Sequence, residues 1–208
     1  MEPKMKHVIF LNGPPRCGKD TVAKILEKHT EPYWDSVGLF KFAQPLRDAA
    51  CAVFGISDDI LDEVKDLPLS KIIDIGDSEE YSKTYTIRKF MIDLSENIIK
   101  PKLGQDFFGI KAAHSIIADS VDFSIVSDSG FAPEVSSAIR VIKNMRPNEF
   151  SFSIWQIQRN GCSFKHDSRN WIFPDDLTVN EDVQFELINN NIGLTELEIR
   201  VIEQYSLI

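Results

Sequence analysis

The stretch that decides the fold is residues 7–21, which read HVIFLNGPPRCGKDT. Its first part, His7 to Asn12, is short and apolar on both faces, which is typical of a buried parallel strand. A turn rich in glycine and proline follows at Gly13–Gly18, and apolar residues then recur at helical spacing from Lys19 to Lys28. The sequence therefore predicts a strand, a glycine-rich loop and a helix in succession, which is how an α/β nucleotide-binding fold begins.

The loop fits the Walker A pattern G-x-x-x-x-G-K-[ST] except at its last position, where Asp20 stands. Glycines permit the backbone angles that turn successive amide N–H groups toward one phosphate, and the following helix points the positive end of its dipole at the same anion. The ammonium group of Lys19 can then bridge the terminal phosphates of ATP. We expect the whole loop to bind ATP, through Gly13, Pro14, Pro15, Arg16, Cys17, Gly18, Lys19, Asp20 and Thr21.

Two carboxylates are candidate ligands of Mg²⁺. Asp20 replaces the usual hydroxyl residue and would bind the metal directly or through water, while Thr21 offers a hydroxyl beside it. Asp128 ends a second apolar strand, Phe123 to Asp128, where ligands lie in open α/β sheets. An equally plain interpretation of Asp128 is a turn residue at the end of a strand. The predicted metal ligands are Asp20, Thr21 and Asp128, with Mg²⁺ as the cofactor and ATP as the phosphoryl donor.

The rest of the chain alternates between strand and helix patterns. Further strands are predicted at 150–158 and 183–188. Helices are predicted at 45–54, 58–66, 87–99 (stopped by Pro101), 108–118, 134–144 and from Thr195 to Glu203, where Thr195 and Glu198 form a capping box. Such alternation predicts an α/β fold in three layers, with a mostly parallel sheet and helices on both faces. We expect a single domain over 1–208, with a mobile insertion at about 68–86 and a lid-like loop at 159–170.

Composition narrows the classes of partner. The formal net charge of −9 argues against a surface that coats DNA or RNA, because such surfaces neutralise phosphates with lysine and arginine. The three cysteines show no spacing of a metal site or disulfide framework, which favours reduced thiols in the cytoplasm. Apolar runs are too short for a signal peptide or a membrane helix. We expect small-molecule nucleotides as partners, with neither nucleic acid nor a membrane; a homodimer is compatible with the sequence.

Five segments of the chain, taken in order, carry a more specific pattern: 13–21, 41–48, 88–108, 127–134 and 159–168. They are similar to G-x-x-x-S-G-K-D-T, F-A-x-P-L-[KR], R-x-x-[LM]…R-x-x-x-G-x-D-x-[FW], D-x-R-F-x-x-E and R…H-x-S. This ordered set resembles the phage deoxynucleoside monophosphate kinases, and it touches most of the chain.

The resemblance implies a P-loop kinase fold and an enzyme of deoxynucleotide metabolism in the host cytoplasm of a phage. Such an enzyme moves the γ-phosphoryl group of ATP to a deoxynucleoside 5′-monophosphate with Mg²⁺. By matching position, Lys19, Asp128 and the lid residue Arg159 would be catalytic. The acceptor nucleotide would be bound by Lys41, Phe42, Arg47, Arg88, Gln105 and Asp106.

The chain departs from the family pattern at two positions. Gly130 stands where the family has an arginine, and Arg169 stands where an acidic residue is usual. The first departure leaves alternatives open: a kinase that acts on a modified base or another acceptor, or a nucleotide-binding regulatory protein without turnover. A purely structural α/β domain with an empty loop is a further alternative.

Overall fold

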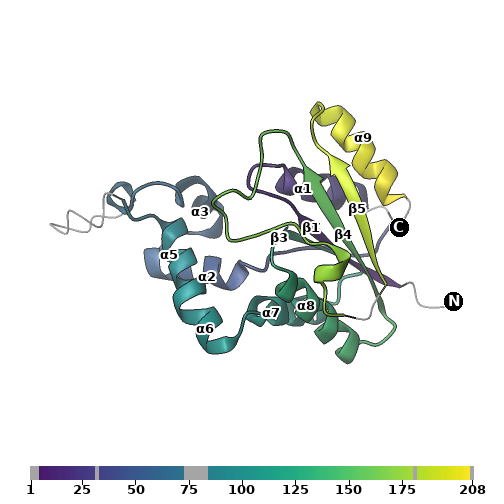
Figure 1. Ribbon diagram of the computed structural model, residues 1–208, viewed down its shortest axis with the longest axis horizontal. Coiled ribbons are helices and arrows are strands. Elements are labelled where there is room, and N and C mark those ends of the chain that lie inside the picture. Colours follow the sequence, from purple (N-terminus) through teal and green to yellow (C-terminus); the bar gives the residue numbers. More distant parts are fainter. Residues whose placement is uncertain (1–4, 31–32, 73–83, 180–181, 207–208) are drawn as a thin grey trace. The chain divides into compact units, whose positions relative to one another are not determined.

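The computed structural model describes residues 5–30, 33–72, 84–179 and 182–206. The chain forms two compact units (Figure 1). Unit 1 combines the chain up to Phe42 with the chain from Phe108 onward, and unit 2 is Ala43–Phe107. The predicted insertion at 68–86 falls within unit 2, and its residues 73–83 lie outside the described residues.

Unit 1 contains one five-stranded sheet in which every neighbouring pair is parallel. Its strands are β1 (Lys6–Asn12), β2 (Val37–Phe40), β3 (Phe123–Ser129), β4 (Phe150–Gln158) and β5 (Val183–Asn189), in the spatial order β2-β3-β1-β4-β5. The central strand β1 is buried on both faces from His7 to Asn12, as its unbroken apolar sequence predicts. The predicted α/β class with a parallel sheet is confirmed.

Helices cover both faces of this sheet (Figure 1). They are α1 (Lys19–Thr30), α7 (Phe107–Asp119), α8 (Ala132–Met145) and α9 (Leu194–Tyr205), and a 3-10 turn, η3 (Pro174–Asp176), lies before β5. Alternate side chains of β1, such as Ile9 and Leu11, share one core with α1 and α9. Helices α7 and α8 cover the opposite face.

The topology creates a switch point at the carboxyl ends of β1 and β3. Helix α1 leads from β1 toward β2 on one side of the sheet, whereas α8 leads from β3 across β1 to β4 on the other. Two adjacent strands whose connections leave in opposite directions form the switch point at which open α/β sheets bind ligands. The glycine-rich loop follows β1 at this point, and Asp128 lies near the end of β3.

Unit 2 is helical. Its elements are α2 (Gln44–Phe54), α3 (Asp58–Val64), the 3-10 turn η1 (Leu69–Lys71), α5 (Ile87–Asp93), the π-helical turn η2 (Leu94–Ile99) and α6 (Lys100–Leu103). They enclose a small core of Ala50, Leu61, Leu69 and Ile87. Gly55 ends α2 with a left-handed φ of 65°, as its position after the apolar stripe predicts.

Three details of the sequence prediction are wrong. Pro101 does not stop the preceding helix: the wider π-helical turn, in which the N–H of Lys100 reaches Ser95, leads into α6 with the proline in its first turn, where no N–H is needed. Thr195 does not cap the last helix, because α9 begins one residue earlier, after Gly193, and has no side-chain cap. The third is the strand β2, which the sequence did not predict. None of the described helices is long and apolar enough to span a bilayer.

Candidate functional site

The glycine-rich loop of unit 1 turns sharply between β1 and α1. Arg16 and Gly18 both have left-handed φ angles, of 65° and 103°. Such residues turn successive amide groups to one side and make a concave surface of N–H donors that suits an anion. The carbonyl of Pro14 accepts the N–H of Cys17 at 3.3 Å, and that of Gly18 accepts Val22 at 3.0 Å, which starts α1.

Lys19 lies against this loop. Its ammonium nitrogen donates to the carbonyl oxygens of Gly13 at 2.6 Å and Pro14 at 3.0 Å. Burial lowers the pKa of Lys19, and the positive charge of Arg169 lowers it further, while Cys17, Asp20 and Asp128 raise it. The ammonium group is thus partly desolvated and lies within reach of the charges of both carboxylates predicted as metal ligands.

Close packing explains the small residues of the loop. A β-carbon on Gly13 would lie 2.6 Å from the carbonyl oxygen of Ile157 and 2.7 Å from the sulfur of Cys17, so a side chain does not fit. Cys17 itself is completely buried, and burial raises the pKa of its thiol, which keeps it protonated at neutral pH. It fills the space under the loop, as expected for a small buried residue.

Asn190, which directly follows the edge strand β5, fixes part of the glycine-rich loop. Its side-chain nitrogen donates to the carbonyl of Cys17 at 2.7 Å, and it occupies the space that a β-carbon on Gly18 would need. The sequence predicts no more than a turn at Asn190. The one signal that could have shown more is its position directly after the last strand, at the carboxyl edge of the sheet.

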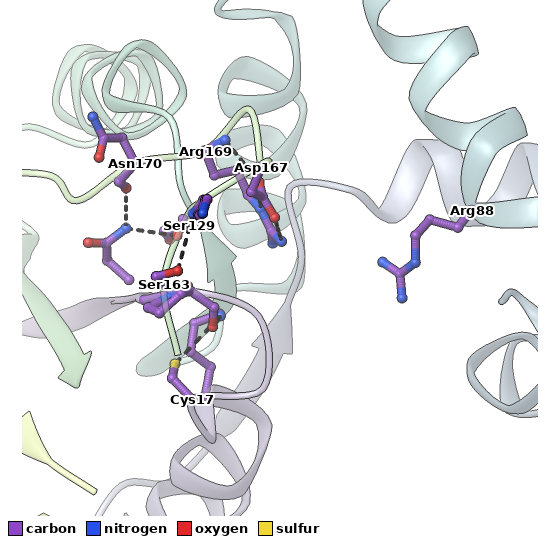
Figure 2. Close-up of polar contacts among 12 residues, drawn as sticks. Cys17, Arg88, Ser129, Ser163, Asp167, Arg169 and Asn170 are labelled. Carbon is purple, nitrogen blue, oxygen red and sulfur yellow. Dashed lines mark hydrogen bonds and ion pairs between the residues drawn. The ribbon is translucent and has the colours of Figure 1, made fainter. Parts of the chain in front are cut away.

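Asp128 and Asn12 organise the carboxyl ends of β3 and β1. One carboxylate oxygen of Asp128 accepts the backbone N–H of Phe42 at 2.8 Å. The side-chain nitrogen of Asn12 donates to the carbonyls of Ser129 at 3.1 Å and Asn170 at 3.0 Å (Figure 2). Its oxygen accepts the N–H of Ile172 at 3.1 Å. Asn12 therefore ties the segment before β5 to two strands of the sheet.

The predicted metal ligands suit a magnesium ion that is shared with phosphates. Asp20 lies exposed in the first turn of α1, with Thr21 beside it. The negative charges of Asp20 and Asp128 both raise the pKa of Lys19. Within the described part of the chain, no group of three or more His, Cys, Asp or Glu side chains gathers to hold a metal. Mg²⁺ needs no such cage, since it commonly takes one or two carboxylates together with phosphate oxygens and water.

The predicted lid, residues 159–170, contains both a predicted and an unpredicted arginine. Arg159 is exposed in the turn after β4, where its carbonyl accepts the N–H of Cys162 at 3.1 Å. Arg169 instead pairs with Asp167: its Nε and Nη2 donate to the two carboxylate oxygens at 2.9 and 2.7 Å (Figure 2). The hydrogen bonds and charge of Arg169 lower the pKa of the Asp167 carboxyl group, against the effect of its burial.

Two residues predicted to bind the acceptor nucleotide belong to unit 1. Phe42 is buried, and its ring stacks on Phe10 with the centroids 6.0 Å apart. What Phe42 offers to the site is its backbone N–H, which Asp128 accepts. Lys41, next to it, is half-buried.

The other four lie in unit 2, on different elements. Arg47 in α2 is buried, and its guanidinium group bonds to the carboxylates of Asp58 at 2.7 Å and Asp62 at 3.0 and 3.1 Å. Arg88 in α5 is exposed and pairs with Asp66 at 2.5 and 2.9 Å. Gln105 and Asp106 lie in the turn after α6, Gln105 exposed and Asp106 half-buried.

The carboxylate partners of Arg47 favour a structural role. Burial lowers the pKa of its guanidinium group, but the hydrogen bonds and charges of Asp62 and Asp58 raise it by more. In turn, the hydrogen bonds and charges of Arg47 and Lys65 lower the pKa of Asp62 against the effect of its burial. This network joins α2 to α3. That Arg47, Arg88, Gln105 and Asp106 bind an acceptor stays a prediction.

Comparison with known proteins finds likeness in structure alone. No protein-family model and no curated protein matches the sequence. Among solved structures, the chain is similar to the APS kinase CysC of Mycobacterium tuberculosis in complex with AMPPNP and APS, at 14% identity and a TM-score of 0.49, over 98% of this chain and 99% of that one. It is also similar to a gluconokinase from Sinorhizobium meliloti, at 11% identity and a TM-score of 0.39, over 98% and 94% of the two chains.

A third similar structure is a cobyrinic acid a,c-diamide synthase from Mycobacterium smegmatis with bound ADP and magnesium, at 14% identity and a TM-score of 0.43, over 97% and 82% of the two chains. Likeness at these identities and scores assigns no substrate or activity to this chain. The residues of the site must carry that conclusion.

Proposed function

We propose that this protein is a kinase that transfers the γ-phosphoryl group of ATP to a deoxynucleoside 5′-monophosphate with the help of Mg²⁺. The observation that carries the proposal is the position of Lys19. Its ammonium group lies on the glycine-rich loop at the carboxyl end of β1, and the negative charge of Asp128, on the neighbouring strand, raises its pKa. A desolvated cation beside a concave row of amide groups suits a polyphosphate.

The donor nucleotide would be bound by residues 13–21. In the structure the ammonium group of Lys19 is bonded to the carbonyls of Gly13 and Pro14. Phosphate oxygens carry more negative charge than carbonyls, so a bound polyphosphate would attract the same ammonium group. In that position Lys19 neutralises the charge that develops on the phosphoryl oxygens as the group moves.

Mg²⁺ would be held by Asp20, Thr21 and Asp128, and when bound it neutralises charge on the phosphates. The chain's own part is to fix these groups in place. Asp20 and Thr21 are fixed by the first turn of α1, and Asp128 is oriented by the N–H of Phe42. Phosphoryl transfer needs little covalent chemistry from the protein, so positioning and charge neutralisation supply most of the catalysis.

The choice of a deoxynucleoside monophosphate as acceptor rests on the family resemblance of five ordered segments. By the same resemblance the acceptor would be bound by Lys41, Phe42, Arg47, Arg88, Gln105 and Asp106, with Arg159 as the lid residue for the transferring phosphate. A monophosphate is already an anion, so the proposed transfer needs no general base from the protein.

The test is a screen of common and modified nucleoside monophosphates with Mg-ATP, read out as release of ADP. Phosphorylation of a deoxynucleoside monophosphate is the expected result, and Lys19→Ala should lower kcat by about 10²–10³-fold, the usual effect of removing one group that stabilises developing charge. Lys24→Ala is the matched control, because Lys24 is exposed on the same helix.

Other results would contradict the proposal in distinguishable ways. Tight binding of ATP without product from any acceptor would indicate a regulatory nucleotide-binding protein. Product from a modified monophosphate alone would keep the chemistry and change the acceptor. Near-normal turnover by Lys19→Ala would overturn the mechanism.

A further inference from the structure

Gly130 is in contact with Arg169. A β-carbon on Gly130 would lie 2.5 Å from Cδ, 2.6 Å from Cγ and 2.7 Å from Cβ of Arg169, so any side chain at 130 would displace the arginine. The φ angle of Gly130 is not in the left-handed region, so the backbone does not require glycine here. Glycine is required at this position because the side chain of Arg169 occupies the space that a β-carbon would need. The two departures from the resembled family thus touch each other.

The backbone on both sides of Arg169 is fixed to the sheet. The N–H of Asn170 donates to the carbonyl of Gly130 at 2.9 Å. The carbonyl of Asn170 and the N–H of Ile172 are both bonded to the side chain of Asn12. Arg169 therefore starts from a short segment that is attached to the carboxyl ends of β1 and β3, beside the glycine-rich loop.

The guanidinium group is oriented by Asp167. Both carboxylate oxygens accept from it, and one also accepts the backbone N–H of Arg169 at 2.9 Å. This pair uses only part of the donors of the guanidinium group, whose planar fork is well suited to phosphate. The side chain of Arg169 is 24% exposed, so it is held in place and still accessible.

Arg169 and Lys19 are close enough for their charges to interact. The hydrogen bonds from Asp167 raise the pKa of Arg169 most, against the effect of burial, and the negative charges of Asp167 and Asp128 raise it further. The positive charge of Arg169 in turn lowers the pKa of Lys19. Two cations that repel each other beside the loop would both be stabilised by an anion bound there.

From this arrangement we propose that Arg169 is a second phosphate-binding residue, which acts with Lys19 on the polyphosphate of the nucleotide. Asp167 orients its guanidinium group, and Gly130 leaves the space for its side chain. The inference rests on the proposed function in one respect, namely that the loop binds a polyphosphate. It adds Arg169 to the cations that the sequence predicts for the site.

The experiment measures binding of inorganic tripolyphosphate and of Mg-ATP by calorimetry. Arg169→Gln is expected to weaken tripolyphosphate binding by about 10- to 100-fold, the size of a hydrogen bond between charged groups. Arg169→Lys should recover only part of the loss, because an ammonium group cannot form the fork. The difference from wild type should shrink as salt is added, which loss of mere packing would not produce. Arg146→Gln, an exposed arginine of unit 1, is the control and should bind as wild type.

A double-mutant cycle tests the role of Gly130 without removing the charge. Gly130→Ala should weaken binding about as much as Arg169→Gln, since the added methyl displaces the arginine. In an Arg169→Gly background the same substitution should have no further effect. An equal loss in both backgrounds would contradict the steric argument.

The outcomes separate the two proposals. If Arg169→Gln and Gly130→Ala both bind tripolyphosphate as tightly as wild type, the inference about Arg169 is wrong and the proposed function stands. If wild type itself binds neither tripolyphosphate nor Mg-ATP, both proposals fail. Thermal unfolding of each variant shows that it is folded, and should Arg169→Gln not fold, Arg169→Lys and Gly130→Ala decide the question.

Discussion

The side-chain nitrogen of Asn190 donates a hydrogen bond of 2.7 Å to the carbonyl oxygen of Cys17, a residue 173 positions away in the chain. Asn190 is itself held by its backbone N–H, which donates to the carbonyl of Gln158 at 2.8 Å. The bond is buried, and it fixes one peptide of the glycine-rich loop from the turn that follows β5. The conformation of the loop thus depends on the last strand of the sheet.

Replacing Asn190 by alanine is expected to lower the free energy of unfolding by about 1–3 kcal/mol, because the buried carbonyl of Cys17 would be left without its donor. Affinity for Mg-ATP should fall as well, since the loop loses its support. Denaturant titration and calorimetry measure the two effects. Asn191→Ala is the matched control, because its hydrogen bonds are at the surface, and it should change both quantities less.

Gly13→Ala should distort the loop, because the new β-carbon would lie 2.6 Å from the carbonyl oxygen of Ile157. Overpacking of this kind typically lowers stability by about 1–3 kcal/mol. We expect a lower melting temperature together with loss of nucleotide binding. A β-carbon on Gly193 would meet nothing within 4 Å, so Gly193→Ala should leave binding unchanged. Equal behaviour of the two variants would show that the loop relaxes around the added methyl.

Arg47 offers a way to separate structure from acceptor binding. Its side chain is only 6% exposed and bonds to Asp58 and Asp62. Arg47→Ala removes a buried side chain and its hydrogen bonds to two half-exposed carboxylates, of which Asp62 keeps Lys65 as a partner, so we expect stability to fall by about 1.5–3 kcal/mol. Arg88→Gln, which breaks an exposed pair with Asp66, should lower stability by no more than about 1 kcal/mol.

Thermal unfolding compares the Arg47 and Arg88 variants. A normal melting temperature for Arg47→Ala, together with a raised KM for the acceptor, would instead show that the arginine serves the substrate.

His7 makes the stability of unit 1 depend on pH. Its ring nitrogens lie 2.8 Å from the hydroxyl oxygens of Ser151 and Ser153, and burial lowers its pKa from 6.5 to about 4. Between these two values the unfolded chain binds more protons than the folded one, so stability falls as the pH falls. The full loss from above pH 6.5 to below pH 4 is about 3 kcal/mol.

Denaturant titrations at pH 7 and pH 4.5 measure this contribution as a difference between wild type and His7→Gln. The variant lacks the titrating ring, so its stability should fall less over the same interval. An identical fall in both proteins would contradict the assignment to His7.

The sequence predicted what depends on local patterns. The strand, loop and helix from His7 to Lys28 could be predicted because each forms a local sequence pattern: an unbroken apolar run, two glycines in a loop, and apolar residues at helical spacing. The strand β2 was not predicted, because it has only four residues, one of which is a glycine, and they form neither an alternating pattern nor a fully buried apolar run: Leu39 is exposed.

What could not be predicted depends on contacts between distant parts of the chain. Asn190 looks like a turn residue until the sheet places it beside Gly18. The role of Gly130 is likewise invisible in sequence, since only the fold brings Arg169 against it. For Arg47, the motif predicted a substrate contact, whereas two acidic residues one helix away take up its hydrogen bonds.

The close contact of Gly130 with Arg169 has an evolutionary consequence. A substitution of Gly130 by any larger residue would remove the space that the side chain of Arg169 occupies. If Arg169 were replaced by a smaller residue instead, a larger residue could be accepted at position 130. The two positions should therefore vary as a pair among descendants of a common ancestor: glycine with arginine in some, and a bulkier residue with a different partner in others. An intermediate in which only one of the two positions has changed would have either a steric clash between the two side chains or a cavity between them.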